Sequence, residues 1–252
     1  VQAAPAGKQT GETEKLTVHF LDVGQGDCTL ITCGSDAMLI DAGDNNQGTR
    51  IQNYLKKQGI KTLDYVIGTH PDADHIGGLD VILYKFNCET ILMTDEQKDT
   101  NTYRDVVRTM KTKGYKNTLP VMGQAYELGD AEFTIVGPSV TGSDSNNNSI
   151  AILLTHGKNK FLFTGDAETE EEQEIMNCGI SIEADVYKAG HHGSRTASSR
   201  EFLEAVSPEY ALISCGEGNS YGHPHAETMN SFRSMGVQVF RTDEQGTVIA
   251  SS

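Results

Sequence analysis

Residues that could bind metal ions are concentrated in one short segment, GTHPDADHIGG, at positions 68–78. Within six positions it carries His70, Asp72, Asp74 and His75. Neutral imidazole and carboxylate are ligands of zinc and related divalent ions, and two such ions about 3.5–4 Å apart commonly hydrolyse phosphate and carboxyl esters. His70 and Asp72 are expected on one side of the turn, while Asp74 and His75 can face a second ion. The segment predicts a metal-dependent hydrolytic site.

Three further candidates follow later apolar segments. Asp166 comes after FLFTG, where its carboxylate could bridge two ions, and the pair His191 and His192 comes after VYKAG. An Asp after TG is often only a turn residue or a helix cap, but two adjacent imidazoles in a Gly-rich loop have little structural purpose. Because these groups recur at strand ends with strand–helix units between them, we expect them to converge on residues 70–75.

The segments between these residues have the periodicity of regular structure. Strands are predicted at 16–24, 28–33, 37–43, 63–70, 88–94, 131–138, 149–157, 160–166, 185–189, 210–216 and 237–243. Helical spacing occurs at 49–59, 77–86, 102–114, 167–179, 199–206 and 225–236. Two strand-rich halves that each alternate with helices predict an α/β (α+β) fold, a four-layer αββα sandwich of two sheets with outer helices.

The chain length and charge limit what the protein can be. Residues 1–15, VQAAPAGKQTGETEK, are mostly small or polar and predict a flexible tether, left by signal-peptide or lipoprotein processing or lying inside a longer protein. Residues 16–252 are expected to form a single hydrolase domain. No segment approaches the roughly 18 apolar residues of a membrane-spanning helix. The net charge of −15 argues against a general polyanion-binding surface, so a phosphate ester would have to be attracted by a local cationic site such as a bound metal. We expect an extracellular or cell-surface bacterial protein, with the cytoplasm as the alternative.

Taken together, THPDADHIGGL, TGD and GHHGS resemble the metallo-β-lactamase superfamily, whose pattern is HxHxDH, a bridging Asp after TGD and a late His. LDVGQGD, MLIDAG, HHGS and YGHPH are similar, more specifically, to the metallo-hydrolase domain of ComEC-type DNA-uptake proteins. The resemblance covers about residues 16–247. It implies the αββα sandwich with its site at the edges of the sheets.

The resemblance also implies a set of metal ligands. A first metal would be held by His70 and Asp72 and a second by Asp74, His75 and His191, with Asp166 bridging the two. Asp72 stands where most relatives have histidine. Glyoxalase-type relatives have a single His after Gly in the last motif, and this favours His191 over His192.

One histidine of the superfamily pattern has no counterpart in this sequence. Most relatives supply it between the first motif and TGD, where this chain reads DSNNNSIAIL, and the ComEC-type pattern lacks it as well. Asn148 and Ser149 are the candidates to reach the first metal, directly or through water.

Each of the other polar residues at strand ends could have either a functional or a purely structural role. Asp22, Asp27 and Asp41 either orient ligand imidazoles, which usually need such an acceptor, or are turn residues. His223 in YGHPH could protonate a leaving oxygen or bind phosphate, unless it only decorates the first turn of a helix. Ser194 could donate to a phosphate oxygen or cap the next helix.

The sequence therefore predicts a binuclear hydrolase that uses zinc, or else manganese or iron. Asp74 and Asp166 would position a metal-activated hydroxide, and His223 or His192 would protonate the departing alkoxide. The resemblance makes phosphodiesters, DNA first, the expected substrates. The alternatives are a secreted phosphoesterase acting on cell-wall or small-molecule esters such as phosphorylcholine, and a non-catalytic, metal-stabilised binding domain.

Overall fold

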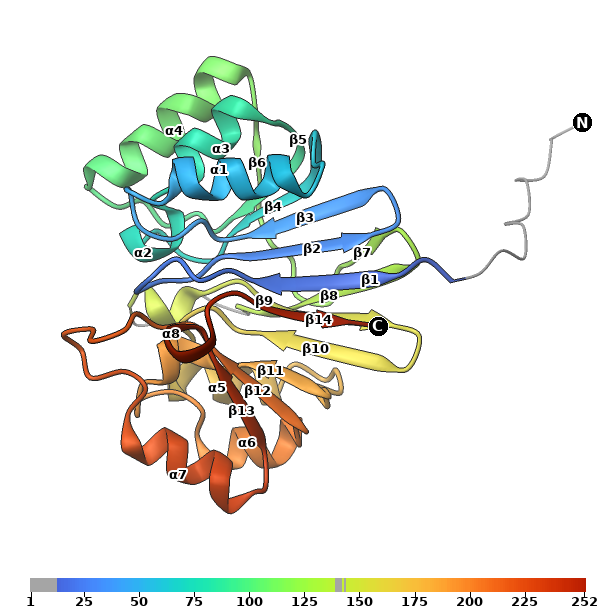
Figure 1. Ribbon diagram of the computed structural model, residues 1–252, viewed down its shortest axis with the longest axis vertical. Coiled ribbons are helices and arrows are strands. Elements are labelled where there is room, and N and C mark those ends of the chain that lie inside the picture. Colours follow the sequence, from blue (N-terminus) through green and yellow to red (C-terminus); the bar gives the residue numbers. More distant parts are fainter. Residues whose placement is uncertain (1–12, 139–141, 143) are drawn as a thin grey trace, which may run out of the picture.

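The computed structural model describes residues 13–138, 142 and 144–252. Two β-sheets pack face to face, and helices cover the outer face of each sheet (Figure 1). The predicted αββα sandwich is confirmed. Residues 1–12 of the predicted tether lie outside the described residues, and residues 13–15 precede the first strand without regular structure.

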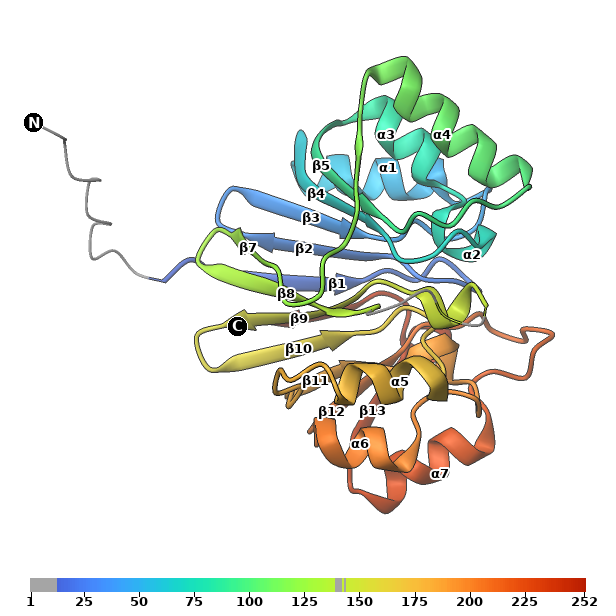
Figure 2. The ribbon, with the colours of Figure 1, turned by 180° about the vertical axis from the view of Figure 1, so that it is seen from behind.

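The first sheet has seven strands within the described chain, in the order β14-β1-β2-β3-β4-β5-β6. The strands are β1 (Leu16–Phe20), β2 (Thr29–Cys33), β3 (Asp36–Ile40), β4 (Thr62–Gly68), β5 (Asn87–Met93), β6 (Asn117–Thr118) and β14 (Val248–Ser251). On the outer face of this sheet lie α1 (Gly48–Lys57), α3 (Leu79–Lys85) and α4 (Asn101–Lys113), while the single turn α2 (Ala73–Ile76) follows β4 at the edge (Figure 2). The neighbours β3, β4 and β5 run parallel, so their carboxyl ends meet at one edge.

The second sheet has seven strands in the described ranges, in the order β13-β12-β11-β10-β9-β8-β7. They are β7 (Ala125–Leu128), β8 (Ala131–Gly137), β9 (Ala151–His156), β10 (Asn159–Phe163), β11 (Val186–Lys188), β12 (Tyr210–Ile213) and β13 (Gln238–Arg241). Its outer helices are α5 (Thr169–Met176), α6 (Arg200–Val206) and α7 (Ala226–Ser234), and the short η1 (Asn146–Asn148), η2 (Gly190–Gly193) and α8 (Thr242–Gln245) lie in connections. Strands β10 to β13 are parallel.

Period-two alternation along the strands separates the core into layers. On β2, Ile31 belongs to the cluster between the two sheets, while its neighbour Leu30 packs under the helices of the first sheet. Between the sheets, the rings of Phe20 and Phe163 stack at 6.0 Å and so join β1 to β10. Burial on both faces fixes the register of each strand, because a shift of one residue would turn its apolar side chains to the wrong face. The strand ends are therefore held in fixed positions.

The last strand returns to the first sheet. β14 pairs with β1 in antiparallel register from Thr17–Ser251 to Phe20–Val248, so the end of the chain completes the sheet that its beginning starts. Through the described ranges of the chain, the structure contains no helix with the length and apolar character needed to cross a membrane.

Candidate metal centre

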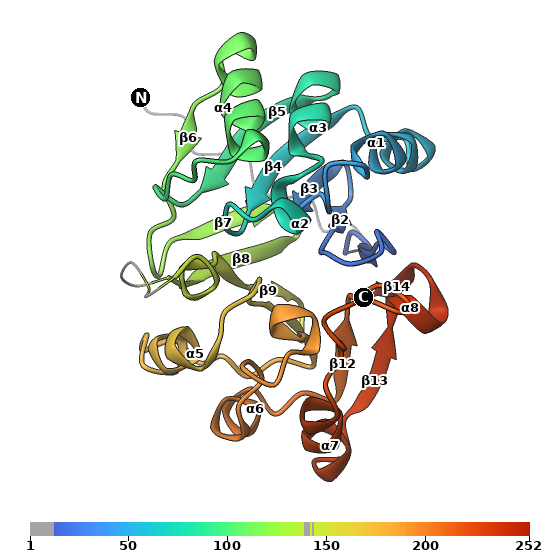
Figure 3. The ribbon, with the colours of Figure 1, turned by 90° about the vertical axis from the view of Figure 1, so that its left-hand side faces the viewer.

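The carboxyl ends of parallel strands from both sheets meet at one edge of the sandwich, seen end-on in Figure 3. Ligand sites of open α/β sheets form at such ends, where the loops that leave neighbouring strands diverge. The turn after β4 carries residues 70–75, the turn after β10 carries Asp166, and η2 after β11 carries His191 and His192. Segments far apart in the chain thus deliver their side chains to one place.

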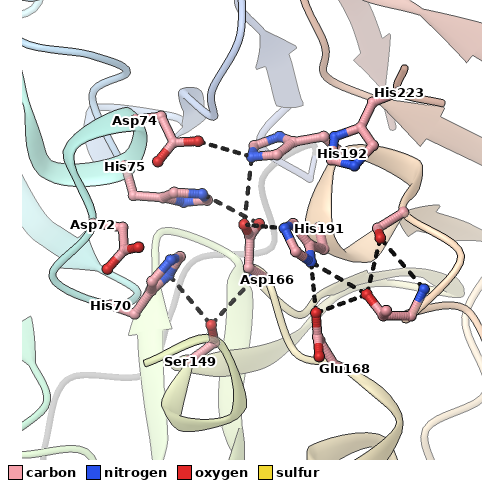
Figure 4. A network of polar contacts seen from close by, with 12 residues as sticks. His70, Asp72, Asp74, His75, Ser149, Asp166, Glu168, His191, His192 and His223 are labelled. Carbon is pink, nitrogen blue, oxygen red and sulfur yellow. Dashed lines mark hydrogen bonds and ion pairs between the residues drawn. The ribbon is translucent and has the colours of Figure 1, made fainter. Parts of the chain in front are cut away.

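Asp166 is the residue at which the predicted ligands meet (Figure 4). Its Oδ1 lies 3.2 Å from His75 Nε2, and its Oδ2 lies 3.4 Å from His192 Nε2 and 3.8 Å from His191 Nε2. His192 Nε2 is also 3.2 Å from Asp74 Oδ2. The structure therefore brings Asp166 and the late histidines against the turn that follows β4.

His70 packs against His75, and the centroids of the two rings are 4.1 Å apart. Its Nδ1 lies 3.1 Å from Thr69 Oγ1 and 3.3 Å from Ser149 Oγ. Ser149 Oγ also accepts a hydrogen bond from the backbone N–H of Asp166. Ser149 therefore lies between the two predicted ligands His70 and Asp166.

Two predicted residues on this side make other contacts. The carboxylate of Asp72, about one-third exposed, pairs with Lys98 rather than with another predicted ligand. Asn148 donates its side-chain amide to Glu96 Oε2 at 3.1 Å. Of the two candidates for the first metal, Ser149 therefore lies against the ligands and Asn148 points to the loop after β5.

Buried ligand atoms test whether these residues fit a metal ion. Several have no hydrogen-bond partner within the described ranges, namely His70 Nε2, His75 Nε2, His192 Nε2 and Asp166 Oδ1. Each such atom costs about 1–3 kcal/mol when it stays unsatisfied, so a group of them points to a bound cation. Ligand atoms of Asp27, His75, Asp166 and His192 all lie within 4.8 Å of one another. A nitrogen and oxygen donor set without thiolate fits zinc, manganese or iron.

The cluster is held together by opposite charges. Burial would raise the pKa of Asp166, but His192 and His75 hold that pKa well below its ordinary value. Burial would lower the pKa of His75, yet Asp166 and Asp41 raise it well above its ordinary value. Burial and then the neighbouring His75 lower the pKa of His70. The buried carboxylates therefore favour positive charge at His75 but not at His70, and a divalent cation would supply positive charge at the same place.

Asp41 orients the imidazole of His75, which is the first of the two roles considered for it from the sequence. It accepts hydrogen bonds from the backbone N–H and the hydroxyl of Thr69, each at 2.8 Å, and from His75 Nδ1 at 2.8 Å. These bonds aim His75 Nε2 at Asp166. Asp41 has a left-handed backbone with φ of 58°, a strained conformation for a residue with a side chain and one that is often found at functional sites.

Asp27 and Asp22 have different roles. Asp27 is buried and pairs with Lys188 Nζ at 2.7 Å. It lies 3.4 Å from His192 Nδ1, but that nitrogen makes its hydrogen bond to the carbonyl of Ser214. Asp22 accepts from the backbone N–H of Gly24 and pairs with an arginine of α1, which agrees with its reading as a turn residue.

The structure reverses the expectation from the sequence that His191, rather than His192, is the ligand. His192 is buried, donates from Nδ1 to the carbonyl of Ser214 at 3.0 Å and turns Nε2 into the cluster. His191 is partly exposed and donates from Nδ1 to Glu168 Oε1 at 2.9 Å, with its Nε2 farther from Asp166. The geometry therefore favours His192 over His191 as the ligand.

His223 is half-buried beside the cluster, and Ser194 is buried in the segment that follows His192. The ring of His223 is 5.4 Å from that of His191 and 6.0 Å from that of His192. Burial, followed by the neighbouring histidines, lowers the pKa of His223 to about 4, so its ring is neutral at pH 7. Ser194 Oγ is 2.9 Å from the hydroxyl of Thr196. Its alternative reading as a helix cap is wrong, because Ser199 caps α6.

Sequence reasoning missed two residues of the site. Glu168 is the partner of His191 and lies two positions after Asp166 in TGDAE. Lys188, 2% exposed, anchors Asp27. A lysine inside the apolar run VYKA was a usable signal, because a buried lysine needs a paired carboxylate.

Comparisons with known proteins agree with this geometry. The profile of the metallo-beta-lactamase superfamily matches residues 21–217. The chain is 31% identical to ComE operon protein 3 of Bacillus subtilis over 254 residues, which cover 92% of this chain and 32% of that protein. It is 30% identical to competence protein ComA of Neisseria gonorrhoeae over 237 residues, 93% of this chain and 32% of that protein. The chain thus spans about one third of the length of these relatives.

A solved structure shows the same fold. The metallo-beta-lactamase fold protein YhfI of Bacillus subtilis superposes with a TM-score of 0.65 at 13% identity, over 95% of this chain and 100% of that one. The fold, the buried His/Asp cluster at the sheet edge and the superfamily match over most of the sequence lead to one conclusion. The chain belongs to the metallo-beta-lactamase superfamily.

Proposed function

We propose that this chain is a two-metal phosphodiesterase that hydrolyses DNA or closely related phosphodiesters. The observation that carries the proposal is the convergence of buried imidazole nitrogens and carboxylate oxygens, from three strand ends in two sheets, on Asp166. A structural role would not require so many buried ligand atoms to be left without hydrogen bonds.

The ligands divide into two groups around Asp166. His192, Asp74 and His75 would hold one ion, with Asp166 next to it. His70 would hold the other, together with Asp72 if its carboxylate exchanges Lys98 for the ion. His192 replaces His191 in this assignment because of its burial and its short approaches to both carboxylates. When bound, divalent ions of this kind lower the pKa of water to near neutrality and polarise a phosphoryl oxygen.

The remaining residues set geometry and move protons. Asp41 and the carbonyl of Ser214 keep His75 and His192 aimed at the cluster. His191, which donates to Glu168, lies on the exposed side of the cluster with Nε2 facing Asp166, where it can protonate the leaving oxygen of a substrate. The hydrogen bond from Nδ1 to Glu168 fixes the orientation of that ring.

The choice of DNA rests on the relatives together with the charge. One relative is named a competence protein, although this chain corresponds to only about a third of it. With a net charge of −15, the chain has to bind a polyanion through its site, because its general surface repels one. A phosphodiester is the group that two divalent ions would attract.

The test combines metal analysis with turnover. The purified chain is expected to bind two equivalents of Zn²⁺ or Mn²⁺ and to hydrolyse bis-p-nitrophenyl phosphate and single-stranded DNA. Asp74→Ala should lose one metal equivalent and nearly all activity while keeping its circular dichroism spectrum. Asp22→Ala, at the turn outside the cluster, is the matched control and should keep both. A chain that binds metal and turns over neither substrate would be a binding domain, and the proposal would be wrong.

A further inference from the structure

An exposed aromatic ring leads directly to the metal centre. Tyr221, in the loop between β12 and α7, is 65% exposed, and its ring stacks on His223 at 5.6 Å with an interplanar angle of 19°. The His223 ring is in turn 6.0 Å from His192, at 32°. A series of roughly parallel rings therefore runs from the surface to a residue of the buried cluster.

The loop that carries Tyr221 is held by its own hydrogen bonds. Asn219 donates its amide to the carbonyls of Gly216 and His223, and it accepts from the backbone N–H of His223 at 3.0 Å. Gln25, from the loop after β1, accepts from the backbone N–H of Gly216 at 3.2 Å. A ring displayed on a pre-organised loop loses little conformational freedom when a ligand stacks on it.

The chemistry of the exposed Tyr221 ring indicates which kind of ligand it can bind. An aromatic face stacks on any nucleobase, independent of sequence, and this is how proteins bind single strands without a base-reading groove. A neutral ring also suits a chain of net charge −15, which cannot rely on a basic surface. In a duplex the base faces are covered by their neighbours, so only an unpaired base can reach the ring.

We propose that Tyr221 is a nucleobase-stacking residue, which binds an unpaired base of a single-stranded nucleic acid while a phosphate next to that base lies at the metal centre. This inference rests on the proposed function for its phosphate site. It adds a preference for single strands, together with the residue that produces it.

Binding can be measured without any turnover, because the sequence contains no tryptophan. Y221W places a single fluorescent ring at the stacking position. Y84W is the matched control, because Tyr84 is the other large exposed aromatic residue in the described chain, 56% exposed on α3 in the outer helix layer. We expect oligothymidylate to quench Y221W but not Y84W, and an abasic oligonucleotide of equal length to quench neither. If oligothymidylate leaves Y221W unquenched, or if it quenches both variants equally, the proposal is overturned.

Kinetics supply the second measurement. Y221A should raise KM for single-stranded DNA by about 5- to 100-fold with kcat little changed, while Y221F should behave like the wild type. On the abasic oligonucleotide, Y221A and the wild type should be alike. An equal loss on both substrates would assign Tyr221 a structural role instead. If the wild type hydrolyses neither substrate while Y221W is still quenched, the hydrolase proposal fails and base stacking stands.

Discussion

His191 and His192 are adjacent in the chain and have similar backbone angles, with φ of 47° and 54°, yet their side chains reach different partners. Both lie in the left-handed region, which residues with side chains rarely adopt. In that conformation the first ring lies against Glu168 and the second turns into the cluster. Which of the two adjacent histidines reaches the cluster depends on the backbone torsion angles, and these cannot be read from a sequence pattern.

The two histidines make a prediction that separates their roles. His192→Ala should lose a metal equivalent, since its Nε2 faces both Asp74 and Asp166. His191→Ala should keep both metals and lose about 10²- to 10⁴-fold in kcat, the usual contribution of a positioned proton donor. Metal content by plasma emission spectroscopy, with kcat on a DNA substrate, distinguishes them. The opposite pattern would return the ligand role to His191.

Much of the site could be predicted from residue types, and the rest depended on contacts between distant segments. His70, Asp74, His75 and Asp166 were found because their types and strand-end positions are unusual. Other features arise only when separate loops pack together, and these are the pairing of Asp72 with Lys98 and the roles of Glu168 and Lys188.

At the scale of elements, helix α5 joins the outer layer to the site. Its residue Glu171 is buried, and Oε2 accepts from the backbone N–H of Ser149, which neighbours His70. Burial raises the pKa of Glu171 well above its ordinary value of 4.5. Its Oε1 has no hydrogen-bond partner within the described part of the chain. The helix therefore holds a carboxyl group that favours its protonated form.

This burial predicts a pH dependence of stability. Because the folded chain holds the Glu171 proton more tightly than the unfolded chain, the free energy of unfolding should fall as pH rises from 4.5 through the folded pKa. Glu171→Gln should remove that part of the decline and make the protein more stable than the wild type at neutral pH. Urea denaturation at acidic and neutral pH measures this. Glu201→Gln, on the exposed face of α6, is the control, and an equal gain there would contradict the assignment.

The elements with apolar, periodic sequences were predictable, and three short strands with largely exposed or half-buried residues were not. The apolar segments of β1 to β5 and β8 to β13 and the helices α1 and α3 to α7 lie within or close to their expected ranges. The missed strands β6, β7 and β14 have two to four residues and are largely exposed or half-buried. Such strands are defined by the neighbour they pair with, so their own sequence carries little signal.

The whole molecule combines strong negative charge with a site that should attract anions. With a net charge of −15, the protein as a whole should repel DNA over distances comparable to the Debye length, and under the proposed function the metal centre would supply the attraction.

Salt should therefore act opposite to its usual effect on DNA-binding proteins. Raising NaCl from about 20 to about 200 mM should leave kcat/KM for single-stranded DNA unchanged or increase it, because screening reduces the general repulsion. Bis-p-nitrophenyl phosphate, which carries only one negative charge, serves as the control for effects of salt on the centre itself. A steep fall with salt, as in proteins that neutralise many phosphates, would reveal a basic groove and contradict this account.

The pairing of β14 with β1 has a consequence for biosynthesis. Until β14 has left the ribosome, β1 has an open edge, and an unpaired strand edge is prone to pair with another chain. We therefore expect the first sheet to close only after nearly all of the described chain has been made. Limited proteolysis of stalled nascent chains should find β1 accessible when translation stops before Val248 and protected when β14 is exposed beyond the exit tunnel.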